Sequence, residues 1–121
     1  MVKLLSASAV LILLALPAIA ADFSGSWQFS VDLENGSHGD PMFVLKQAGD
    51  KVTGSYNGPL GNDLRVTGTV KGNTLVIELK AKMEDQPTTV TYTGTLDSPG
   101  KMHGTVSFSG GPSGKWTAAT K

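Results

Sequence analysis

The side chains that could perform catalysis or hold a metal ion are few in this sequence and lie far apart. The chain has no cysteine, which excludes a thiol nucleophile and a thiolate metal site. Its two histidines, His38 and His103, are 65 positions apart, whereas a metal site usually needs three or more converging ligands. No G-x-S-x-G nucleophile elbow occurs. We therefore expect no catalytic residue, no metal site and no cofactor.

The acidic residues do not change this expectation. Asp32, Glu34 and Asp40 gather around the first loop, but their spacing does not match an EF-hand calcium loop. Every other acid falls in a loop, near a terminus or on the polar face of a strand. Because the expected interior holds no charged group, it offers no general acid or base. The sequence therefore predicts a protein that is not an enzyme.

Aromatic residues carry the strongest chemical signal. Seven of them recur on one face of the alternating runs described below: Trp27, Phe29, Phe43, Tyr56, Tyr92, Phe108 and Trp116. Several rings with few polar tips suit a small, mostly apolar ligand. We predict that the ligand-binding residues are Trp27, Tyr56, Tyr92, Phe108 and Trp116. The alternative is a solid core in which the seven rings fill the interior completely.

The elements that must position these rings are eight short runs in which apolar and polar residues alternate. They cover residues 27–33, 42–47, 52–56, 64–71, 75–80, 89–96, 102–108 and 115–119. Such a period of two indicates β-strands with one buried face. Glycine, asparagine and proline occupy the short connections between them, which is typical of hairpin turns.

Short connections favour antiparallel neighbours, because parallel strands need long crossovers. The sequence thus predicts an all-β domain, an eight-stranded antiparallel up-and-down β-barrel in which consecutive strands form a meander. A two-sheet β-sandwich is the alternative, since it would satisfy the same alternation.

Four glycines fall in mid-strand on the inward face: Gly54, Gly68, Gly94 and Gly104. Glycine weakens a strand, so its presence should serve the geometry of the barrel. We interpret these positions as sites of strand curvature and of packing against the large rings. The alternative is that they open a small internal cavity.

The first 20 residues have the layout of an export signal. Lys3 precedes an apolar run over residues 4–16, and Pro17 to Ala20 ends it with small residues, Ala18 and Ala20, at the minus-three and minus-one places. The run is too short for a comfortable membrane span, so we expect cleavage after Ala20 and no stable membrane anchor. Residues 21–121 then form a single domain that is periplasmic or extracellular.

Charge limits the partners of this domain. The chain has 10 basic and 10 acidic residues, and removing Lys3 leaves 9 against 10, a net charge of −1. Nucleic-acid binding demands a basic footprint, which is missing here. We expect a monomer, because the outer face shows no large apolar patch.

Two short motifs resemble known barrel families. Gly25-Ser26-Trp27 resembles the G-x-W opening of lipocalin and avidin-like (calycin) barrels, and Val52 to Tyr56 is similar to the T-G-x-Y stretch of avidin-like proteins. The resemblance implies that Trp27 closes one end of the barrel and that the Tyr56 hydroxyl faces a ligand. The biotin-site residues are missing, since Phe29 stands where that family has asparagine. The segment from Gly25 to Gly61 also looks like small exported bacterial barrels.

The sequence thus supports two functional hypotheses. The first is a secreted or periplasmic, non-enzymatic barrel that binds a small apolar ligand inside. The second is a solid-core interaction, accessory or inhibitor protein that acts on an exported partner through its loops, at 34–41 or 57–63.

Overall fold

Alternating apolar and polar residues form nine strands over residues 21–121, the part of the chain that the computed structural model describes. The expected export signal, residues 1–20, lies outside this part. The strands are β1 (Gly25–Leu33), β2 (His38–Gly39), β3 (Met42–Ala48), β4 (Lys51–Gly58), β5 (Gly61–Lys71), β6 (Thr74–Met83), β7 (Gln86–Ser98), β8 (Lys101–Phe108) and β9 (Ser113–Thr120). Within residues 21–121 there is no helix that could cross a membrane.

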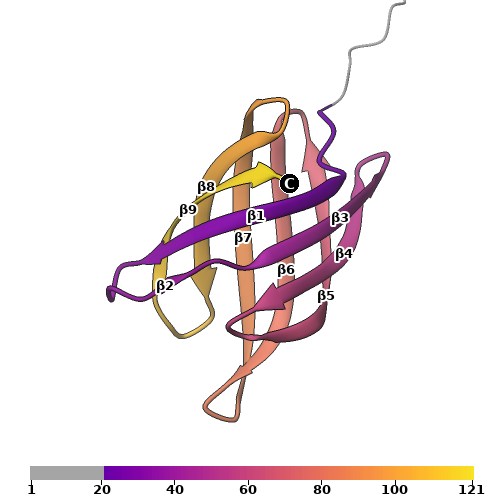
Figure 1. The fold of residues 1–121 in the computed structure, drawn as a ribbon. Coiled ribbons are helices and arrows are strands. Elements are labelled where there is room, and N and C mark those ends of the chain that lie inside the picture. Colours follow the sequence, from indigo (N-terminus) through magenta and orange to yellow (C-terminus); the bar gives the residue numbers. More distant parts are fainter. Residues whose placement is uncertain (1–20) are drawn as a thin grey trace, which may run out of the picture.

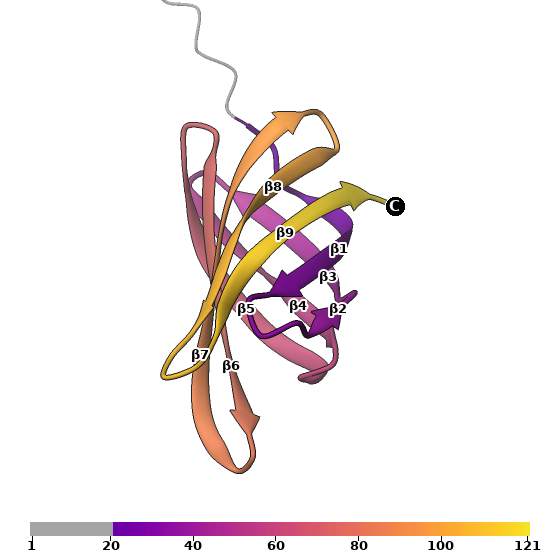
Figure 2. The same ribbon diagram turned by 90° about the vertical axis from the view of Figure 1, so that its left-hand side faces the viewer.

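The strands close into an antiparallel barrel (Figure 1). From β3 onward each strand pairs with the next, and β9 pairs with β1 from Trp27↔Thr120 to Leu33↔Gly114. The two-residue β2 and the longer β3 pair with successive parts of β1, so together they act as one strand with a bend between them. The wall therefore has eight strands. This confirms the predicted up-and-down barrel and excludes the two-sheet sandwich (Figure 2).

One turn differs from the sequence prediction. The alternating runs stop at residue 80 and resume at residue 89, which leaves Pro87 in a connection, but Gln86 and Pro87 belong to β7 and pair with Met83 and Lys82. Glu84 and Asp85 complete the reversal with φ values of 51° and 66°. Pro87 is tolerated because β8 pairs with β7 only from Val90 onward, so its missing N–H removes no ladder bond on that side.

All seven aromatic residues of the alternating runs point inward, as predicted, and none is more than 9% exposed. Phe29 lies at the centre of the cluster. Its ring centroid is 4.3 Å from that of Phe43, 4.5 Å from that of Trp116 and 5.5 Å from that of Tyr92. The middle of the barrel is therefore filled with rings.

Phe23 and Trp27 seal the end of the barrel at which the described chain begins. Trp27 is 1% exposed, and its Nε1 donates a hydrogen bond of 2.8 Å to the carbonyl oxygen of Phe23. The amide of Phe23 in turn donates to Oε1 of Gln47 at 2.8 Å. Phe23 is fully buried although it precedes the first alternating run, and the alternation does not assign it to the core.

The mid-strand glycines lie where neighbouring strands or rings pass very close. A Cβ atom on Gly104 would overlap the carbonyl oxygen of Thr93 and come within 2.7 Å of the Gly94 Cα. A Cβ atom on Gly94 would overlap the ring of Trp116. A Cβ atom on Gly54 or on Gly68 would likewise overlap a backbone carbonyl oxygen of the neighbouring strand. These contacts support the interpretation that the glycines serve strand curvature and ring packing.

Candidate functional site

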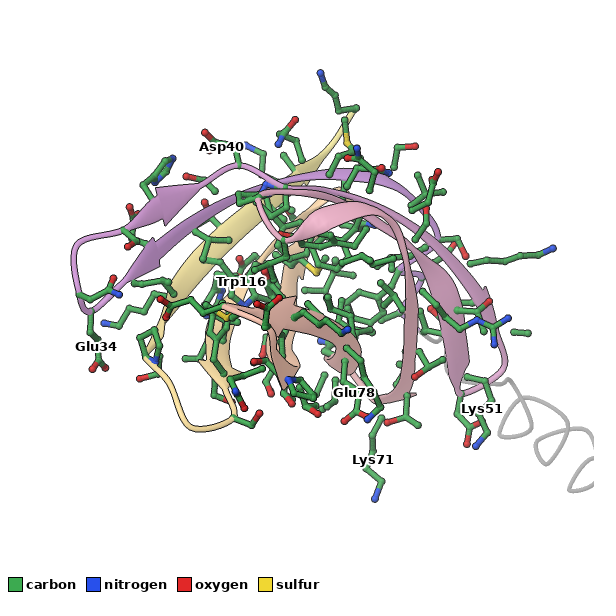
Figure 3. All side chains as sticks on the ribbon, turned by 90° about the horizontal axis from the view of Figure 1, so that it is seen from below. Glu34, Asp40, Lys51, Lys71, Glu78 and Trp116 are labelled. Atoms are coloured by element: carbon green, nitrogen blue, oxygen red, sulfur yellow. The ribbon has the colours of Figure 1, made fainter. Side chains whose placement is uncertain are left out.

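A pocket of about 390 Å³ occupies the end of the barrel opposite Trp27. The β1–β2 loop, the β4–β5 turn, the β6–β7 turn and the β8–β9 loop surround its mouth (Figure 1). The lining residues are Val31, Leu33, Asn35, Ser37, His38, Gly39, Pro41, Tyr56, Pro59, Leu60, Met83, Glu84, Tyr92, Phe108 and Pro112. Figure 3 views the barrel from this end, with Trp116 inside the wall and Glu34 at its edge.

Two buried tyrosines line this pocket, and the ring of Phe43 packs against both of them. Tyr56 and Tyr92 are each 2% exposed. The Phe43 ring packs edge-on against both, with centroid distances of 5.1 Å in each case. The Tyr56 hydroxyl accepts a long hydrogen bond of 3.4 Å from the amide of Leu60. Burial raises the pKa of both phenols above the usual value, so both remain neutral hydrogen-bond donors over the physiological range.

The pocket brings together three of the five predicted ligand-binding residues: Tyr56, Tyr92 and Phe108. Trp27 lies at the sealed end. Trp116 is stacked on Phe29 with an interplanar angle of 26° and donates from Nε1 to the carbonyl oxygen of Thr105 at 2.8 Å. Neither tryptophan lines the pocket.

The sequence analysis missed the apolar residues that complete the pocket wall. Pro59, Leu60 and Pro112 lie in connections, and Met83 ends β6. Only Leu60 and Met83 carry a sequence signal, because a large apolar side chain beside a turn is unusual, whereas proline is a common turn residue. The loops 34–41 and 57–63, expected to be partner-binding surfaces under the second hypothesis, both contribute to the rim of this pocket.

The mouth of the pocket continues into a split in the barrel wall. Pairing between β5 and β6 stops at Val66↔Leu79. Beyond that point β5 continues to pair with β4 as far as Gly61, and β6 with β7 as far as Met83. The two hairpins therefore separate, as Figure 2 shows for the protruding β6–β7 hairpin. Leu60 and Met83 line the pocket from opposite sides of this split.

His38 lies on the pocket rim between two carboxylates. Its Nδ1 is 2.8 Å from Oδ1 of Asp32, and its Nε2 is 2.9 Å from Oδ1 of Asp40. A carboxylate oxygen only accepts hydrogen bonds, so both contacts are favourable together only when the imidazole carries two protons. These hydrogen bonds raise the pKa of His38 above 6.5. Glu34, the third acid of the loop, instead accepts from Oγ of Ser113 at 3.0 Å.

The first testable prediction concerns the titration of His38. In an NMR titration, its midpoint should lie above 6.5 and should fall when Asp32 is replaced by asparagine. A raised pKa in the folded state means that the protonated form stabilises the fold. That contribution is complete below the pKa of the unfolded chain, and it is lost as the pH rises through the pKa of folded His38. A His103→Gln control should leave the midpoint unchanged, and a midpoint at or below 6.5 would contradict the geometry.

Comparisons with known proteins relate this chain to designed barrels. No protein-family model and no curated protein matches it. A redesigned β-barrel, b11L5F_LGL, superposes with a TM-score of 0.67 and 17% identity, over 81% of this chain and 90% of that chain. The redesigned barrel mFAP0, bound to DFHBI, superposes with a TM-score of 0.59 and 20% identity, over 79% of this chain and 96% of that chain. The redesigned barrel mFAP1, also bound to DFHBI, superposes with a TM-score of 0.59 and 18% identity, over 81% of this chain and 94% of that chain.

The chain has the fold of these barrels. At identities of 20% or less, this similarity concerns the architecture alone. The function must therefore be argued from the site itself.

Proposed function

We propose that this chain is an exported, non-enzymatic barrel that binds a small, largely apolar ligand in the pocket at its open end. The observation that carries the proposal is the asymmetry of the barrel. One end is sealed by Trp27 and Phe23, and the other holds a pocket of about 390 Å³ with buried tyrosines inside. This volume falls in the range of ligand sites, roughly 300–1,000 Å³.

Two further observations support ligand binding. The redesigned barrels mFAP0 and mFAP1 share this fold and are bound to DFHBI. Trp27 also lies where the resemblance to lipocalin and avidin-like barrels implies, at the closed end. We therefore propose a distant relationship to these families, without the biotin-site residues.

The location and assembly state belong to the same proposal. The pattern of residues 1–20 supports export to a periplasm or to the outside of the cell. Val44 on β3 and Val76 on β6 are the large exposed apolar residues within 21–121, and they are on strands that do not pair with each other. An outer wall without a large apolar patch supports a monomer.

A titration with Nile red, a neutral apolar probe, tests the proposal. We expect saturable one-to-one binding to the folded domain. Met83→Trp should fill the pocket and weaken binding by at least about ten-fold, because a bulky ring would occupy the space of the probe. Val44→Trp adds the same ring on the exposed face of β3 and should leave affinity unchanged.

Two outcomes would contradict the pocket as the binding site. One is an absence of saturable binding to a cooperatively folded domain. The other is an equal loss of affinity in both tryptophan variants, which would indicate a general effect of the added ring.

A further inference from the structure

The Tyr92 hydroxyl lines the pocket without a protein partner. Tyr92 is 2% exposed, and no hydrogen bond of its hydroxyl is present within residues 21–121. In the same part of the chain, no side-chain nitrogen or oxygen that is fully shielded from solvent lacks a partner. The Tyr92 oxygen therefore still borders open space, which is the space of the pocket. A ligand that fills the pocket would strip water from this hydroxyl and must replace the lost hydrogen bond.

Tyr56 places a second donor nearby. Its oxygen accepts from the Leu60 amide, so the hydroxyl proton remains free to donate. The two phenols are close enough for a charge on Tyr56 to raise the pKa of Tyr92, and Phe43 contacts both rings. Two free phenol protons in one small pocket match an oxygen atom with two lone pairs.

The pocket contains no free positive charge that would neutralise an anionic ligand group. No lysine or arginine lines it. Of its other titratable residues, His38 is engaged by Asp32 and Asp40, and Glu84 carries a negative charge that would repel an anion. Burial of an unpaired charge is costly, which favours a neutral acceptor.

We propose that the pocket takes a neutral, compact apolar molecule whose inner end carries a carbonyl-type acceptor, with the Tyr92 hydroxyl as its principal donor and Tyr56 as a second. This inference rests on the proposed ligand-binding function. It adds the chemical class of the ligand, which would present an uncharged carbonyl oxygen on an otherwise hydrocarbon surface.

Two probes of nearly the same shape test this preference. Fluorenone carries a carbonyl group where fluorene carries a methylene group, and their affinities can be compared by equilibrium dialysis. We expect fluorenone to bind about five-fold more tightly than fluorene to the unaltered protein, the ratio for one net hydrogen bond of about 1 kcal/mol. Tyr92→Phe should bring this ratio close to one, and Tyr56→Phe should lower it less.

Phe108→Leu is the matched control, because it removes apolar contact from the pocket and should weaken both probes alike. The carbonyl stretch of bound fluorenone gives a readout that needs no variant. Its frequency should be lower in the protein than in a hydrocarbon solvent, as expected for a hydrogen-bonded carbonyl.

The outcomes separate this inference from the proposed function. Equal binding of the two probes with an unshifted carbonyl stretch would overturn the acceptor preference and leave a purely apolar pocket. A preference that survives Tyr92→Phe would overturn the role of Tyr92. If neither probe binds and Nile red also fails, the ligand-binding function itself is wrong.

Discussion

Trp27→Ala should lower the free energy of unfolding by about 3–5 kcal/mol, the usual cost of truncating a buried tryptophan. The ring is 1% exposed and closes the barrel end together with Phe23, so its removal would leave a cavity lined by apolar groups. Urea denaturation followed by circular dichroism would measure the loss. Small domains have a total stability of about 5–15 kcal/mol, so this single change would remove a large part of it.

Two companion variants separate packing from hydrogen bonding at this end. Trp27→Phe keeps most of the ring volume but loses the Nε1 bond to the Phe23 carbonyl, and it should cost less than the alanine variant. Val44→Ala changes a side chain that is 45% exposed and should cost less than about 0.5 kcal/mol. A loss below about 1 kcal/mol in Trp27→Ala would show that Trp27 does not seal the barrel.

Gly104→Ala should destabilise the barrel by about 3 kcal/mol, the upper part of the range for overpacked sites. The added methyl group would overlap the carbonyl oxygen of Thr93 on the neighbouring strand β7. Because that atom belongs to the backbone of a paired strand, relief requires the barrel wall itself to shift. Thermal or urea unfolding would show the difference from the unaltered protein.

Gly111→Ala is the matched control for this prediction. A Cβ atom there would meet only Phe108, with its Cβ as the nearest atom at 3.3 Å, and Gly111 has no positive φ value. We expect a change of less than about 1 kcal/mol, with either sign, because alanine also restricts the unfolded chain. Equal effects at the two positions would mean that the close strand approach at Gly104 is not important for stability.

The fold could be predicted because a single sequence periodicity determines which side chains face the interior. A period of two assigns each side chain to the inside or outside, and eight such runs with short turns leave few alternatives to a closed meander. This alternation alone is enough to assign Trp27, Phe29 and Tyr92 to the interior. The alternation does not assign Phe23, because this residue precedes the first alternating run and enters the core from the irregular segment before β1.

The candidate site could be predicted only in part, for a physical reason. Alternation shows that a residue faces inward, but it does not show how far along the barrel axis the residue lies. Tyr92 and Trp116 share the inward face, yet one borders the pocket and the other packs in the solid middle. The bracketing of His38 by Asp32 and Asp40 also depends on loop geometry, which strand patterns do not describe.

The split between β5 and β6 has a consequence for behaviour at high concentration. Closure of a barrel normally removes every free strand edge, but here β6 from Lys80 to Met83 has no neighbour on the β5 side. Such an edge could form hydrogen bonds with a second molecule and begin self-association. The two outward-facing residues of this stretch, Lys80 and Lys82, are both exposed lysines. Lysine side chains repel the same edge of a second molecule. The split can therefore remain open without leading to self-association.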